Sequence, residues 1–201
     1  MNHRPTPQAT LAGFEPASPT DRLFFALFPD RASVARLAAL AQEQADRHGL
    51  RGAPLPPERF HLTLFHLGDW AGLPPDVVDA ACRAAAQLHA TAFEVRLDEV
   101  ASFASRREKK PFVLKARGGN QALRSFHAEL ARQLGMLGLA RAASESFEPH
   151  VTLLYDRRLV PAEPVPPVAW QAGEWVLVHS LLGQGRHLRL GSWPMDGAAG
   201  G

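Results

Sequence analysis

The sequence predicts an α+β protein made of two pseudo-symmetric lobes of mostly antiparallel sheet, with outer helices and a cleft between the lobes. One observation is a repeat. The pattern His–apolar–Thr–apolar occurs as HLTL at residues 61–64 and as HVTL at 150–153, which is 150 − 61 = 89 residues later. The other observation is the arrangement around each copy, where short strand-like runs alternate with helical stretches over short connections. Each half of the chain therefore contributes one copy to a shared fold.

Strands are predicted where short apolar or alternating runs end at Pro, Gly or polar residues. They cover residues 22–28, 60–67, 93–103, 112–116, 146–156, 175–182 and 186–190. The last two strands are predicted to form a hairpin around residues 183–185. Residues 160–167 are rich in Pro and are predicted to be a linker.

Helices are predicted at residues 30–49, 76–90 and 120–139, where apolar residues recur every three or four positions. Asp30 is a suitable N-cap for the first helix, and Gly49 is a suitable C-terminal stop. The three helices fall between strands, as expected if they cover the outside of the sheet.

The two ends of the chain have the composition of loose tails. Residues 1–20 are rich in Pro, Thr, Ser and Ala, and residues 196–201 are mostly Gly and Ala. Such segments bury too little apolar surface to order themselves. We predict disordered tails at 1–20 and 196–201 around a single bilobal domain at 21–195.

The overall composition, with 46% hydrophobic and 21% charged residues, is that of an ordinary globular protein. A formal net charge of +2 permits an anionic partner without demanding one. Cys82 is the only cysteine, which excludes an internal disulfide and cysteine-rich zinc sites. No apolar run reaches the ~18 residues of a membrane span, and the N-terminal stretch lacks the apolar core of a secretory signal. We expect a cytoplasmic monomer with no membrane partner.

The repeated motif places two kinds of reactive group on one face of each strand. Strand alternation puts His61 and Thr63, and likewise His150 and Thr152, on the face opposite their apolar neighbours. A neutral imidazole can take a proton from water, and a charged one can give a proton to a leaving oxygen. The Thr hydroxyls can donate hydrogen bonds to an anionic oxygen between them. This set suits hydrolysis of a phosphodiester without a metal.

Two alternatives remain open from the residues alone. A single His-x-Thr on a strand is usually structural, and only the matched second copy favours a shared site. Two histidines could also bind a metal, but no obvious third ligand stands at coordination spacing, although Asp69, Asp156 and other histidines are available. We therefore predict no metal and no cofactor.

The flanks of both motifs resemble those of a known family. The stretches RLFFALFPD, RFHLTLFHLGD, FEPHVTLLYD and LVHSLLGQGRHLRLGSWPM are similar to the two-histidine (2H) phosphoesterase superfamily, and within it to bacterial RNA 2′,3′-cyclic phosphodiesterases, also called 2′-5′ RNA ligase-like proteins. The similarity runs from about residue 22 to residue 194. It implies a bilobal fold and hydrolysis of RNA or small nucleotide 2′,3′-cyclic phosphates to 2′-phosphates. It assigns catalysis to His61 and His150, and phosphate binding to Thr63 and Thr152.

The sequence departs from the family pattern at one position. Many ligase-type bacterial members have an Arg five residues after the second His, where this chain has Tyr155, as plant cyclic phosphodiesterases do. A phenol can donate one hydrogen bond but brings no charge, so Arg157 or Arg158 is expected to supply it. Strict alternation would point Tyr155 away from the His150 face, so a twist at the strand end is needed to bring it in.

Further candidates have competing interpretations. Phe103 could stack on a base or pack in the core, and Arg59 could face the cleft or solvent. The basic loop at residues 106–110 could hold RNA phosphates or be solvated. His66 is expected on the face opposite His61, as a packed or surface residue.

The leading hypothesis is a metal-independent phosphodiesterase acting on RNA ends or nucleotides with a 2′,3′-cyclic phosphate. The alternatives are 2′-5′ RNA ligation at the same site, which would use the same two histidines, and a non-catalytic RNA- or nucleotide-binding module. The polar surroundings after His150 favour it as the base and His61 as the acid, although the sequence leaves this assignment open.

Overall fold

The computed structural model describes residues 17–139 and 147–197, which form eight strands, three α-helices and one 3₁₀ turn. The elements are β1 (Asp21–Leu27), α1 (Arg31–His48), the 3₁₀ turn η1 (Pro57–Arg59), β2 (Leu62–Trp70), α2 (Pro75–Ala86), β3 (Phe93–Ser102), β4 (Lys110–Lys115), α3 (Gln121–Met136), β5 (His150–Asp156), β6 (Glu163–Ala172), β7 (Glu174–Leu181) and β8 (Arg186–Pro194). The predicted helices and strands are all present, with ends shifted by a few residues. Residue 146, the predicted start of the second motif strand, lies outside the described residues.

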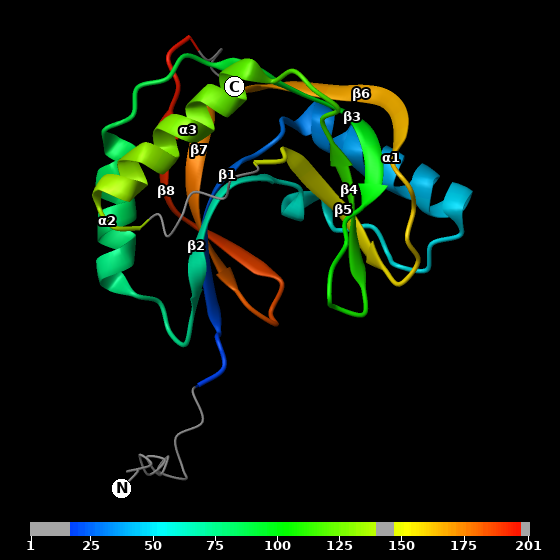
Figure 1. The fold of residues 1–201 in the computed structure, drawn as a ribbon, viewed down its shortest axis with the longest axis horizontal. Coiled ribbons are helices and arrows are strands. Elements are labelled where there is room, and N and C mark those ends of the chain that lie inside the picture. The colour runs from blue at the N-terminus through cyan, green and yellow to red at the C-terminus, as the bar shows by residue number, and fades with distance from the viewer. Residues whose placement is uncertain (1–16, 140–146, 198–201) are drawn as a thin grey trace, which may run out of the picture.

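The strands form one antiparallel sheet in the order β6-β3-β4-β5-β2-β1-β7-β8. At its centre, β2 and β5 share a single register pair, Leu62 with Val151. The sheet therefore divides there into two four-stranded parts. We call β1, β2, β7 and β8 the first lobe, and β3 to β6 the second lobe. Figure 1 shows α2 and α3 beside the first lobe, with α3 also contacting β3, and α1 beside the second lobe. This arrangement confirms the α+β architecture.

The lobes are not the two halves of the chain. The C-terminal hairpin β7–β8 returns to pair with β1 in the first lobe. The predicted linker at 160–167 is wrong, because most of it belongs to β6, which pairs with β3. Pro164, Pro166 and Pro167 cannot donate to a sheet, but β6 is an edge strand, where the missing N–H groups are tolerated.

Each motif strand contains a β-bulge at the same place. Leu64, which follows Thr63, has no register partner on β1. Leu153, which follows Thr152, is passed over in the pairing of β4 with β5. An extra residue on one strand reverses the side to which the following residues point. This local irregularity decides which later side chains reach the cleft.

The two faces of the motif strands have different environments. Leu62 and Val151 are fully buried in the main hydrophobic core, where the apolar face of the sheet packs against the helices. The opposite face carries the His and Thr of each motif. The predicted caps of α1 are confirmed: Asp30 accepts a hydrogen bond from the Ser33 N–H, and Gly49 is left-handed with φ of 60°.

Residues 17–20 and 196–197, which were predicted to belong to the tails, are part of the described structure. The backbone of Thr20 bonds to Trp70 and Leu182, and that of Asp196 bonds to Ala90 and Ala92. Residues 1–16 and 198–201 lie outside the described residues. Among the helices of the described part, none is long and apolar enough to cross a membrane.

Candidate active site

The two motifs meet at one cleft of about 900 Å³ between the lobes. The cleft is lined from the first lobe by Arg22, Phe24, Arg59, His61, Thr63, His66, Ser180, Leu181, Leu182, Gly183, Gln184, Gly185 and His187, from the second lobe by Arg107, Pro111, His150, Thr152 and Tyr155, and between them by Leu55. Three of these described lining residues are Arg, and none is Asp or Glu. The cleft therefore has the charge to attract an anion.

His61 is enclosed by aromatic rings. It stacks on Phe24 with a centroid distance of 5.0 Å and meets the edge of His187 at 5.1 Å. Its Nδ1 donates to the carbonyl oxygen of Arg59 at 2.7 Å, which leaves Nε2 free. Burial lowers the pKa of His61 from 6.5 to about 4, and the positive charge of neighbouring His187 and Arg59 adds to this effect. His61 is therefore neutral at pH 7 in the ligand-free protein.

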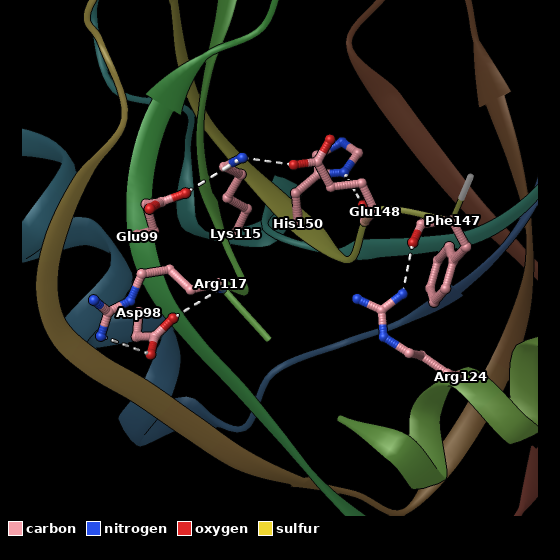
Figure 2. Close-up of polar contacts among 8 residues, drawn as sticks. All are labelled: Asp98, Glu99, Lys115, Arg117, Arg124, Phe147, Glu148 and His150. Carbon is pink, nitrogen blue, oxygen red and sulfur yellow. Dashed lines mark hydrogen bonds and ion pairs between the residues drawn. The ribbon is translucent and has the colours of Figure 1, made fainter. Parts of the chain in front are cut away.

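His150 is oriented in an equivalent way. Its Nδ1 donates to the carbonyl oxygen of Glu148 at 2.8 Å. The carboxylate of Glu148 is itself held by Lys115 at 2.6 Å, and Lys115 also lies 3.3 Å from Glu99 (Figure 2). In both motifs, the residue two positions before the histidine thus accepts from Nδ1 through its main chain. Both histidines present Nε2 for chemistry.

The segment before His150 has a second attachment. Nη1 of Arg124, on α3, donates to the carbonyl oxygen of Phe147 at 3.0 Å, as Figure 2 shows. Lys115 therefore fixes this segment from the second lobe, while Arg124 fixes it from the helix outside the first lobe. Both contacts hold the segment whose Glu148 carbonyl accepts the Nδ1–H of His150.

Thr63 and Thr152 also line the cleft and are half-buried. Each lies on the same strand face as the histidine two residues before it. Because β2 and β5 run antiparallel through Leu62 and Val151, the four motif side chains gather around the point where the lobes join. The structure brings together the four residues that the repeat predicted.

The two bulges bring the residues five positions after each histidine into the cleft. His66 lines it from the first lobe, so the prediction that His66 faces away is wrong. The bulge at Leu64 reverses the alternation on which that prediction rested. Tyr155 lines the cleft from the second lobe for the same reason, through the bulge at Leu153 rather than a twist at the strand end. His66 and Tyr155 are thus pseudo-symmetric counterparts.

The position of Tyr155 is fixed by the loop that precedes η1. The carboxylate of Asp156 accepts the backbone N–H groups of Arg51 and Gly52 at 2.6 and 2.7 Å. A Cβ at Gly52 would lie 2.0 Å from the carbonyl oxygen of Tyr155, so only glycine fits there. This close approach anchors the end of β5 beside the cleft.

Two other predicted substrate-binding residues lie elsewhere. Arg157 is exposed, pairs with Glu108 at 2.6 Å and does not line the cleft, because it follows the last residue of β5 and points toward the β3–β4 loop. Phe103 is not among the lining residues either. It meets His150 edge-on at 4.9 Å, which makes it a support for that ring.

The predicted basic loop contributes one side chain to the cleft. Arg107 lines it, whereas Arg106 and Lys109 are exposed without lining it. The Nζ of Lys110 donates a hydrogen bond to the carbonyl oxygen of Glu108 within the same loop. Of the proposed phosphate contacts, only Arg107 is placed at the cleft.

Sequence reasoning missed Arg22, Phe24 and His187 as cleft residues. Phe24 lies in the apolar run of β1, and the sequence does not distinguish it there from residues of the hydrophobic core. Arg22 binds Asp69 through two hydrogen bonds of 2.7 and 2.6 Å, so its charge is largely neutralised. The position of His187 depends on the return of the C-terminal hairpin to the first lobe, and no local pattern signals it.

A metal centre was the other use considered for the two histidines. Within residues 17–139 and 147–197, no group of three or more His, Cys, Asp or Glu side chains is arranged to hold a metal ion. Asp69 pairs with Arg22 and His66, and Asp156 binds backbone N–H groups, so both carboxylates already have partners.

A pair of His-x-Thr strands facing one cleft between two lobes defines the class of two-histidine phosphoesterases. The chain belongs to the 2′-5′ RNA ligase superfamily, whose family model matches residues 28–182. It is 32% identical over 171 residues to a protein of Thermus thermophilus named RNA 2′,3′-cyclic phosphodiesterase, a match that covers 80% of this chain and 82% of that protein.

Solved structures share the fold. E. coli LigT complexed with 3′-AMP superposes with a TM-score of 0.70 at 23% identity, covering 89% of this chain and 99% of LigT. The protein TT0787 of Thermus thermophilus gives a TM-score of 0.63 at 24% identity, covering 89% of this chain and 100% of that chain. At these identities, the likeness shows the bilobal fold.

Proposed function

We propose that this protein hydrolyses 2′,3′-cyclic phosphates of RNA ends or small nucleotides to 2′-phosphates, without a metal, using His61 and His150 as the proton-transfer pair. The observation that carries the proposal is the matched orientation of the two imidazoles. Each donates Nδ1–H to a main-chain carbonyl and keeps Nε2 for the shared cleft. The named activity of the Thermus thermophilus relative supports the same reaction.

The chemistry follows from this orientation. A water molecule attacks phosphorus while the bond from phosphorus to the ribose 3′-oxygen breaks. One Nε2 takes the proton from water, and the Nε2–H of the other histidine gives a proton to the departing 3′-oxygen. In-line attack requires one imidazole on each side of the phosphate, and the two lobes supply one each. Thr63 and Thr152 donate hydrogen bonds to the remaining phosphoryl oxygens.

The positive charge of the cleft lining supports a phosphate ester as the substrate. Arg59 and Arg107 line it together with polar side chains, whereas Arg22 is paired with Asp69, and Phe24 offers an apolar surface near His61. The LigT structure with 3′-AMP shows that the same fold accepts a nucleotide monophosphate. We extend that class of ligand to this cleft.

The decisive experiment incubates the purified protein with the four nucleoside 2′,3′-cyclic phosphates and identifies the product isomer by phosphorus NMR. We expect the 2′-phosphate. A 3′-phosphate product would mean that the bond from phosphorus to the 2′-oxygen breaks instead. If neither these nucleotides nor short RNAs with a cyclic phosphate are hydrolysed, the protein is a binding module and not an enzyme of this kind. Adding an RNA with a 5′-hydroxyl end to the same reaction tests ligation, because joined product appears only if the reverse reaction occurs at this site.

A further inference from the structure

Arg59 lies in the cleft wall directly beside His61. Its carbonyl oxygen accepts the Nδ1–H of His61, while its side chain also lines the cleft. Its guanidinium is close enough to both His61 and His187 to lower the pKa of each, after the larger effect of burial. One residue therefore orients His61 through its main chain and brings a positive charge to the same wall through its side chain.

The side chain of Arg59 has no anionic partner in the described part of the chain. Its Nε is shielded from water and has no hydrogen-bond acceptor. By contrast, Arg22 in the same cleft is neutralised by Asp69. The same wall holds a second unpartnered buried atom, Nδ1 of His187. Leaving such donors or acceptors unpaired costs free energy, and a bound anion would relieve that cost at Arg59.

The residue equivalent to Arg59 in the second motif carries no positive charge. The counterpart of Arg59 in the second lobe is Glu148, whose side chain is bound by Lys115. In the described structure, the end of β5, where the sequence predicted a cation, brings no arginine into the cleft. Tyr155 is uncharged, and Arg158 donates to the carbonyl oxygen of His48, away from the cleft. Arg107 also lines the cleft from the second lobe, but Arg59 is the arginine whose charge acts on His61 and His187.

We propose that Arg59 is a substrate-binding residue that holds the cyclic phosphate between the histidines, so that the first lobe supplies the positive charge that Tyr155 lacks. The proposal rests on the proposed function. A guanidinium can donate two parallel hydrogen bonds to phosphoryl oxygens, a geometry matched to phosphate. A bound phosphate would also offset the charge that Arg59 exerts on His61, so substrate binding and protonation of His61 become coupled.

Binding of inorganic phosphate, measured by calorimetry, tests this without requiring turnover. We expect Arg59→Gln to weaken phosphate binding about 10- to 100-fold, the usual weight of a hydrogen bond to a charged group. Arg59→Lys should retain part of the affinity and serves as the second variant if Arg59→Gln does not fold. Arg36→Gln removes an equal charge from the exposed face of α1 and should change nothing. Unchanged affinity in both Arg59 variants would overturn the proposal.

Two further measurements separate the possible outcomes. In NMR titrations, Arg59→Gln should raise the pH at which His61 titrates, because a neighbouring cation is gone, and phosphate should then shift that titration less than in the wild type. On adenosine 2′,3′-cyclic phosphate, Arg59→Gln should raise KM by a similar factor. A loss seen only on a dinucleotide would place Arg59 at the neighbouring phosphate and overturn its assignment to the cyclic one. Wild-type protein that binds phosphate but hydrolyses no cyclic phosphate would refute the proposed function alone.

Discussion

Leu62 pairs with Val151 at the only register position shared by β2 and β5 in the described structure, and the two residues occupy the same place in the two motifs. Because each of the two residues pairs with its own repeat counterpart, a local pseudo-two-fold axis passes between them. The histidine before each and the threonine after each are therefore brought to one cleft by a single backbone contact. The side chains of Leu62 and Val151 pack in the main hydrophobic core, on the sheet face opposite the cleft.

The first prediction concerns the two histidines. His61→Ala and His150→Ala should each lower kcat by about 10²- to 10⁴-fold on a 2′,3′-cyclic nucleotide, the usual weight of general acid–base catalysis. The double variant should lose far less than the product of both factors, because the residues act as a unit. Circular dichroism should show intact folding, since neither imidazole is part of the core. Nearly normal turnover in either single variant would contradict a shared site.

The proton roles can be separated with a substrate whose leaving group needs no acid. The assignment from sequence predicts that His61→Ala recovers most of its activity on such a substrate, whereas His150→Ala does not. Since His61 is neutral in the ligand-free protein, this assignment requires the bound phosphate to raise the pKa of His61. Recovery in His150→Ala would reverse the roles, and recovery in neither would mean that the histidines mainly stabilise charge.

The second prediction concerns pH. The active enzyme must hold one proton on the histidine pair, so the acidic limb of the kcat/KM profile should fall near the pKa of His61, about 4, whichever role it plays. If the pKa of His61 were the ordinary 6.5, the acidic limb of the kcat/KM profile would instead lie more than two pH units higher. Stopped-flow or initial-rate assays from pH 3.5 to 8 distinguish these outcomes, with protein stability checked at each pH.

The same pKa makes a prediction for stability. The pKa of His61 is lower in the folded state than its usual 6.5, so the unfolded chain binds the proton more tightly. The contribution is fully present above pH 6.5 and is lost as pH falls toward 4. Between pH 7 and 5, this histidine should account for about 2 kcal/mol of lost unfolding free energy. In urea titrations, His61→Gln should lose correspondingly less over this range, and an equal loss would contradict the lowered pKa.

The third prediction concerns the support behind His150. Lys115→Met removes the ion pairs that hold Glu148, while the carbonyl that binds His150 remains. We expect kcat to fall about 3- to 30-fold with little change in KM, because a small displacement of a catalytic group slows chemistry more than binding. Arg117→Met is the matched control, since Arg117 is exposed and pairs with Asp98 away from His150 (Figure 2). Equal effects in the two variants would assign Lys115 a role in stability only.

The fourth prediction concerns longer RNA. Arg107 is the residue of the basic loop that lines the cleft, so Arg107→Gln should weaken binding of a cyclic-phosphate oligonucleotide and reduce its salt dependence by about one ion. Hydrolysis of a mononucleotide should barely change, because that substrate has no further phosphates. The exposed Lys109→Gln is the control. Equal losses on both substrates would place Arg107 in the catalytic site.

The fifth prediction concerns metals. Activity should persist after treatment with EDTA and dialysis, because proton transfer by two imidazoles needs no metal. The assay is turnover of a cyclic nucleotide before and after chelation. Loss of activity that zinc or manganese restores would instead favour a metal at the two histidines.

The sequence by itself determined which four residues of the two motifs share one strand face each. The strict spacing within each His-x-Thr motif is local, and strand alternation places two neighbouring same-face residues together whatever the tertiary context. The helix caps at Asp30 and Gly49 are local signals too, and both are present. Such features depend only on residues within one strand or one turn.

Only the tertiary structure decided what surrounds the motifs. The bulges at Leu64 and Leu153 are properties of strand pairing, and they reversed the expected orientation of His66 and Tyr155. The return of β7 and β8 to β1 placed His187 against His61 across a long stretch of sequence. The charges at the cleft likewise depend on which partners the fold supplies. An arginine is neutralised where a carboxylate lies opposite it and remains available where none does, and no local pattern encodes that difference.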